Sequence, residues 1–146
     1  MNNINDITAD ILNVAFKLHT MYGPGLYESA YELLMKIELQ RSGHKVERQK
    51  PVSIEHEGVV VDNAFRLDLL VDEKVVVELK STEQHSAVFA KQLKTYLVLC
   101  EKSVGLLINF GQISLRNGIE RIVNRYEGPP LSPRGEEPRK YSEPSP

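Results

Sequence analysis

The sequence is short of cysteine, of long apolar runs and of any excess of charge, and each shortage narrows the class of protein. The single cysteine, Cys100, excludes an internal disulfide and is typical of a reducing compartment. No apolar run approaches the roughly 18 residues that a membrane-spanning helix needs, and the first residues lack the basic and apolar segments of a signal peptide. We therefore expect a soluble, cytoplasmic protein with no membrane partner.

Charge is nearly balanced, because 18 lysines and arginines face 20 aspartates and glutamates. No global basic field results, so tight non-specific binding to nucleic acid is not predicted. The 146 residues, 41% hydrophobic and 26% charged, are typical of one globular domain with a real core.

Proline is scarce except at the carboxyl-terminal end, where residues 129–146 contain six of the eight. Such a polar, proline-rich segment cannot bury enough apolar surface to order itself. We predict a folded domain over residues 1–126 and a disordered tail over residues 127–146. Within the tail, residues 130–133 match P-x-x-P, a weak signal for a protein partner.

What the sequence does contain is a hairpin pattern at residues 66–80, which read R-L-D-L-L-V-D-E-K-V-V-V-E-L-K. Two runs rich in β-branched residues flank a polar triplet at residues 72–74. Side chains alternate across a strand, so Glu78 and Lys80 share one face while Val77 and Leu79 take the other.

The position of Asp68 depends on the length of the hairpin loop. A three-residue loop pairs Val71 with Val75 and brings Asp68 opposite Glu78, whereas a two-residue loop places Asp68 opposite Val77. We favour the first register because it collects the charges at one spot. Three-residue loops usually contain a residue in the left-handed region, however, and this loop lacks glycine.

Two carboxylates held side by side repel one another, and without a counter-charge one of them tends to keep its proton. Mg²⁺ removes this conflict, because it binds one or two carboxylates together with waters and phosphate oxygens. Lys80 would then lie near the phosphate or the attacking water. The alternative is that the E-x-K pattern is a set of charges facing solvent on an exposed strand.

The second of three helical segments, residues 26–41, is apolar around most of its circumference and should be largely covered by protein. Glu28 lies at the edge of its polar side, where a glutamate is either part of a site or simply solvated. An acidic residue this early also gains from the helix dipole. The predicted apolar stripe consists of Leu26, Ala30, Leu33 and Ile37, and it is extended around the helix by Tyr27, Leu34, Tyr31 and Met35. The predicted polar side consists of Ser29, Glu32, Lys36 and Gln40.

The third helical segment, residues 87–100, places Gln92 and Tyr96 near the middle of an apolar arc that also contains Val88, Phe89 and Leu93. A buried glutamine costs about 1–3 kcal/mol unless it finds hydrogen-bond partners. We therefore expect a polar partner beneath Gln92, with the hairpin as the nearest candidate. A glutamine that bonds to nearby backbone is an equally good interpretation.

The remaining segments are predicted from periodicity and turn residues. A first helix covers residues 6–22, with Asn5 or Asp6 as its cap, and strands cover residues 46–54, 59–71, 75–80, 103–109 and 119–124. All four histidines are expected at the surface, since none has metal-site spacing. The basic residues Lys45, Arg48 and Lys50 either contact phosphates or form a solvated strand edge.

This order of elements, with D…E-x-K in the hairpin, resembles the PD-(D/E)XK nuclease superfamily. The chain looks most like the GxxExxY protein family, whose motif stands here as residues 25–31, G-L-Y-E-S-A-Y, and the resemblance covers residues 6–124. Gln92 and Tyr96 match a Q-x-x-x-Y motif of one branch of the superfamily. The residue before Asp68 is Leu67 in place of the proline of the superfamily name.

The resemblance implies an α/β fold with a restriction-endonuclease-like core, in which helices flank a central mixed β-sheet. It also implies phosphodiester hydrolysis in nucleic acid with Mg²⁺, for which Mn²⁺ often substitutes. Asp68, Glu78 and the backbone carbonyl of Leu79 would bind the ion, and Glu28 a second ion or a metal-bound water. Lys80 would orient water or stabilise charge, Gln92 would hold the site or the substrate, and Tyr31 and Tyr96 would support them.

A rival interpretation belongs to a different class, a non-catalytic module with a nuclease fold. Its acidic cluster would be a remnant, and its tail or basic strand would recruit nucleic acid or a protein partner. The intact D…E-x-K…Q set favours the enzyme, because a pure binder has no physical need to hold repelling carboxylates together.

Overall fold

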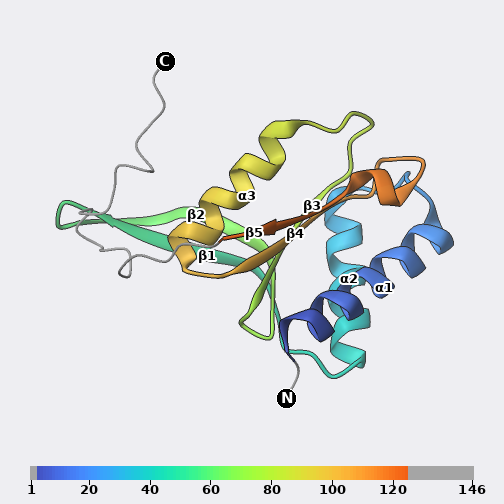
Figure 1. Cartoon of the computed structure of the whole chain (residues 1–146), viewed down its shortest axis with the longest axis horizontal. Helices are drawn as coiled ribbons and strands as arrows, with labels where there is room; N and C mark the ends of the chain where they lie inside the picture. Colours follow the sequence, from blue (N-terminus) through green and yellow to red (C-terminus); the bar gives the residue numbers. More distant parts are fainter. Residues whose placement is uncertain (1–2, 125–146) are drawn as a thin grey trace.

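The computed structural model describes residues 3–124, which form a five-stranded sheet with helices on both faces (Figure 1). The strands follow the chain in the order β1-β2-β3-β4-β5, and all neighbours are antiparallel except β3 and β4, which are parallel. The predicted mixed α/β sheet is therefore confirmed. Its elements are α1 (Ile4–Tyr22), α2 (Glu28–Arg41), β1 (Val46–His56), β2 (Val59–Val71), β3 (Val75–Lys80), α3 (Ala87–Cys100), β4 (Val104–Asn109), the 3₁₀ helix η1 (Leu115–Gly118) and β5 (Ile119–Val123).

Two apolar cores lie on the two faces of the sheet. Helices α1 and α2 cover the face that bears Val77, Leu79 and Ile108, and α3 covers the face that bears Val76 and Leu107. Because β3 and β4 are covered on both sides, every residue of β4 is buried, as its continuous apolar run predicted. Helix α3 forms the crossover that two neighbouring parallel strands require.

The hairpin between β2 and β3 has the predicted three-residue loop, because Val71 pairs with Val75. The loop achieves this without glycine. Asp72 and Glu73 both adopt left-handed backbone conformations, with φ of 53° and 58°. Side-chain contacts hold Asp72 there, since its carboxylate accepts a hydrogen bond from the backbone N–H of Lys45 at 2.9 Å.

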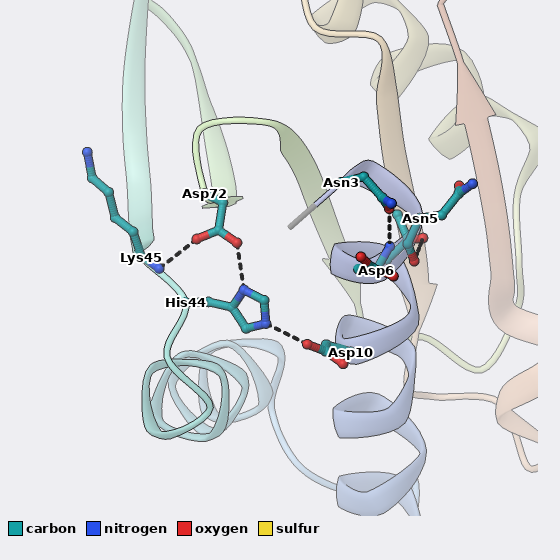
Figure 2. A network of polar contacts seen from close by, with 8 residues as sticks. Asn3, Asn5, Asp6, Asp10, His44, Lys45 and Asp72 are labelled. Carbon is teal, nitrogen blue, oxygen red and sulfur yellow. Dashed lines mark hydrogen bonds and ion pairs between the residues drawn. The ribbon is translucent and has the colours of Figure 1, made fainter. Parts of the chain in front are cut away.

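His44 is the anchor of this turn, and its expected surface position was wrong. Its side chain is only 1% exposed, with Nδ1 2.6 Å from Asp72 and Nε2 2.8 Å from Asp10 (Figure 2). The imidazole therefore links the β2–β3 turn to α1. Two carboxylates from distant parts of the chain make this polar group tolerable in a buried position, and neither is evident from local sequence.

Helix boundaries match the predictions closely, but the buried faces differ in α2. Asn3, two or three residues earlier than expected, caps α1 by accepting a hydrogen bond from the N–H of Asp6. In α2, Leu33 and Ile37 of the predicted apolar stripe are 46% and 42% exposed. The helix buries Tyr31 and Met35, which were expected to extend that stripe, together with Glu32 and Leu39. Apolar residues surround α2, so periodicity alone left its orientation open.

Helix α3 has the predicted bounds, but it is rotated relative to the predicted arc. Leu93, Leu97 and Val98 are buried, whereas Val88 and Gln92 are exposed. Gln92 therefore needs no polar partner beneath it. The predicted tail at residues 127–146 lies outside the described residues. Across residues 3–124, no helix has the combination of length and apolarity needed to cross a bilayer.

Candidate active site between β2 and β3

The backbone pairing of β2 with β3 ends at Leu69 and Val77, although both strands continue beyond this point. Past it, β2 leaves with β1 as a separate arm (Figure 1). Beyond this point, side-chain carboxylates accept the backbone N–H groups that connect the two strands. The N–H of Asp68 donates to Oε2 of Glu78 at 3.0 Å, and the N–H of Leu79 donates to Oδ2 of Asp68 at 2.8 Å. Asp68 and Glu78 are thus held side by side.

These two carboxylates have strongly perturbed acidities. Burial raises the pKa of Asp68 to about 6, against the opposing hydrogen bond from Leu79. Burial and the neighbouring charge of Asp68 raise the pKa of Glu78 to about 8. The pair therefore tends to keep one proton near neutral pH when no cation is present, which agrees with the repulsion inferred from the sequence.

Lys80 places a positive charge on the face of β3 that also bears Glu78. Its Nζ lies 4.7 Å from the ring centroid of Phe89, which belongs to α3. Its charge opposes the upward pKa shifts of Asp68, Glu78 and Glu28. The face of the aromatic ring attracts the ammonium and holds it beside α3.

Glu28 joins this cluster from α2, whose first residue it is. Burial raises the pKa of Glu28, and the charge of Glu32 adds to that shift. Its charge in turn contributes to the raised pKa values of both Asp68 and Glu78. The structure therefore brings together the four charged residues that the sequence singled out.

Tyr31 explains how the loop before Glu28 is held. Its hydroxyl donates to the carbonyl of Gly23 and accepts from the N–H of Leu26 at 3.1 Å. Its ring stacks on Phe110 with centroids 4.1 Å apart. The hydroxyl of Ser81, next to Lys80, donates to the carbonyl of Leu26 at 2.7 Å and so ties this loop to the end of β3.

The sequence did not predict two residues of the site, Glu32 and Gln49. Glu32 was assigned to a polar, solvated side of α2, yet it is only 2% exposed. Nε of Arg48 lies 2.7 Å from Oε1 of Glu32, an ion pair without hydrogen-bond alignment. Gln49 donates to both oxygens of Glu32, at 3.0 and 2.9 Å. The spacing of four residues from Glu28 was the one available signal, since it places Glu32 on the same face of α2.

The predicted basic cluster is divided by the structure. Arg48 faces Glu32, whereas Lys45 pairs with Glu73 and Lys50 with Glu47. Lys45 and Lys50 line a groove of about 480 Å³ together with Lys102 and Cys100. The three residues therefore do not form one phosphate-binding surface.

The two residues of the Q-x-x-x-Y pattern also have different environments. Tyr96 stacks on Phe65 of β2, with centroids 4.4 Å apart. Burial raises the pKa of the Tyr96 hydroxyl, and the charges of Glu78 and Asp68 add to the shift, so this residue lies near the site. Gln92, in contrast, points from α3 toward solvent.

The model of one protein family, the PD-(D/E)XK nuclease superfamily, matches residues 5–122. The chain belongs to this superfamily. The five-stranded mixed sheet with flanking helices is its restriction-endonuclease-like fold, and nuclease-like function is what membership indicates. No curated protein and no solved structure matches the chain.

Nucleases of the PD-(D/E)XK superfamily generally depend on a divalent metal, and the donors here fit one. Among residues 3–124, no group of three or more histidine, cysteine, aspartate or glutamate side chains is arranged to enclose an ion. Mg²⁺ needs less than that, because waters and phosphate oxygens complete its coordination around one or two carboxylates. The buried carboxylate of Glu78 and the half-buried carboxylate of Asp68 are a hard donor set of this kind.

Proposed function

We propose that the chain is a metal-dependent nuclease of the GxxExxY family that hydrolyses phosphodiester bonds in DNA. The observation that supports this most is the pairing of Asp68 with Glu78 where the β2–β3 ladder ends. Holding two carboxylates together in a partly buried position is unfavourable in the free protein, as the raised pKa values of both show. Such an arrangement becomes favourable when a cation and a substrate phosphate are bound.

In this proposal Asp68, Glu78 and the backbone carbonyl of Leu79 hold a divalent cation, Mg²⁺ or Mn²⁺. Glu28 holds a second ion or a water from the α2 side. A bound cation lowers the pKa of water and offsets the charge that develops on the phosphate. The protein fixes the two carboxylates in advance, because each accepts a backbone N–H of the opposite strand.

Lys80 has the role of orienting the attacking water or stabilising the charge on the phosphate, which suits a compact ammonium. Arg48, half-buried beside Glu32, has the position of a substrate-binding residue, whereas Lys45 and Lys50 contact substrate from a different groove. Gln92, exposed on α3, is assigned to contact the nucleic-acid backbone. Tyr31 and Tyr96 support Glu28 and the α3 side of the site.

The test is cleavage of single-stranded, duplex and branched DNA and of RNA, each with Mg²⁺, Mn²⁺ or EDTA. Lys80→Ala should fold and bind nucleic acid within a few-fold of wild type, because a group acting in the transition state changes turnover more than affinity. Its cleavage rate should fall by about 100- to 1,000-fold. Lys91→Ala, at an exposed lysine of α3, is the matched control and should cleave normally.

Two results would contradict the proposal. Equal cleavage by Lys80→Ala and wild type would show that the β2–β3 site is not catalytic. Absence of metal-dependent cleavage by wild type on every substrate, with nucleic acid still bound, would favour the non-catalytic binding module instead.

A further inference from the structure

We infer that Gln49 is a positioning residue: the buried Glu32–Arg48 pair holds its amide, and the amide fixes Asp68 in the orientation that binds the cation. The inference deepens the proposed function, since the cation site is the one described above. The chain of contacts runs from α2 through β1 to β2. It joins Glu32, which is nearly inaccessible to solvent, to the carboxylate at the end of the β2–β3 ladder.

The backbone of Gln49 is the first evidence for this role. Gln49 has φ of 53° within β1, a left-handed conformation that non-glycine residues adopt at a cost. In a regular strand, neighbours point to opposite faces, so Arg48 and Gln49 would not reach the same partner. The left-handed residue breaks this alternation, and both side chains contact Glu32.

The position of Gln49 along β1 is the second piece of evidence for this role. Arg48 pairs with Leu69 and Lys50 with Leu67, so Gln49 lies across from Asp68. Its Nε2 donates to Glu32 at 2.9 Å and lies 3.5 Å from Oδ1 of Asp68. The amide therefore stands between two carboxylates, and it contacts the Asp68 oxygen that Leu79 does not use.

Gln49 also satisfies the oxygens of Glu32, whose charge Arg48 neutralises without an aligned hydrogen bond. That contact alone does not account for the position of Nε2 beside Asp68. All three contacts of Nε2 are to carboxylate oxygens, two on Glu32 and one on Asp68. Residues that hold a metal ligand through a hydrogen bond typically change metal affinity by 10- to 100-fold when they are removed.

The variant Gln49→Gly tests the amide contact with Asp68 separately from the left-handed backbone conformation, because glycine lacks the amide and accommodates that conformation. Glycine adopts φ of 53° without penalty, which offsets part of the cost of removing the hydrogen bonds to Glu32, and Arg48 still pairs with Glu32. The variant should therefore fold while the amide is lost. The matched control is Asn63→Gly, because Asn63 is an exposed residue of β2 with the same φ of 53°. Gln49→Asn, which tolerates this conformation and keeps a shorter amide, is the second variant.

Two readouts apply. The first needs no metal: exchange of the Leu79 amide proton, which donates to Asp68, measured by NMR at fixed pH. Loss of the hydrogen bond should accelerate exchange about tenfold in Gln49→Gly, with a smaller effect in Gln49→Asn and none in Asn63→Gly. The second is calorimetric binding of Mn²⁺, which should weaken 10- to 100-fold in Gln49→Gly alone.

Unchanged Leu79 exchange in Gln49→Gly would overturn the inference and leave the proposed nuclease activity intact. Equal Mn²⁺ affinity in Gln49→Gly and wild type would also overturn it. If wild type neither binds Mn²⁺ nor cleaves, the proposed function fails, and the exchange of Leu79 still decides whether Gln49 positions Asp68. Should Gln49→Gly not fold, the same measurements on Gln49→Asn decide.

Discussion

Removing one oxygen atom, by Tyr31→Phe, tests how the G-x-x-E-x-x-Y segment places Glu28. Tyr31 is 0% exposed, and its ring stacks on Phe110. Phenylalanine keeps the ring, its volume and its stacking, so packing is preserved. The loss is confined to two hydrogen bonds, one to the carbonyl of Gly23 and one from the N–H of Leu26.

The size of the effect depends on whether these two backbone groups find other hydrogen-bond partners in the variant. A buried polar group left without a partner costs about 1–3 kcal/mol. Gly23 and Leu26 are only partly buried, so water reaches them to some extent and the lower end applies. We expect the free energy of unfolding to fall by about 1–2 kcal/mol, which lowers Tm by about 3–8 °C for a chain of this size.

Urea and thermal unfolding followed by circular dichroism measure this loss. Tyr27→Phe is the matched control, because Tyr27 lies in the same segment and is 85% exposed. If the chain is a nuclease, Tyr31→Phe should also lose turnover, since the loop before Glu28 is no longer fixed. Unfolding energies within about 0.5 kcal/mol of each other for the two variants would refute the reasoning.

Two further predictions concern residues away from the candidate site. Burial alone would lower the pKa of His44, but hydrogen bonds to Asp72 and Asp10 raise it, and the His44 contact helps to lower the pKa of Asp72. The free-energy difference between wild type and His44→Gln should therefore be fully present near pH 5–6, below the usual histidine pKa of about 6.5. It should shrink as pH rises through the folded-state pKa of His44, and also as pH falls below about 4, where Asp72 gains its proton; a pH-independent difference would contradict this account. Gly111→Ala should destabilise by more than about 2 kcal/mol, because its Cβ would lie 2.3 Å from the backbone oxygen of Thr82. Gly25→Ala, where no atom lies within 4 Å, should change stability by less than about 0.5 kcal/mol in the same unfolding assay.

Local sequence was sufficient for the elements whose signal is periodic and short in range. The alternation of residues 75–80 predicted that Glu78 and Lys80 share the face opposite Val77 and Leu79, and the helix at residues 87–100 was predicted with its observed bounds. The pattern left two hairpin registers open, and the one favoured because it gathers the charges is confirmed by the pairing of Val71 with Val75 and by the contact of Asp68 with Glu78. These features depend on residues within about ten positions of one another, where strand and helix periods act directly.

Tertiary structure alone decided which polar groups are buried and why. His44, Glu32 and Gln49 resemble ordinary surface residues in the sequence, yet each contacts a carboxylate or an arginine from a distant element. The same holds for Gln92, which was expected inside and lies outside. A charged or amide group is tolerated in a core only when partners satisfy it, and those partners are set by how helices and strands pack. Periodicity predicts which residues share a face of a helix or strand, but it does not predict which residues of other elements pack against that face. The buried polar contacts of the site could therefore be identified only from the folded structure.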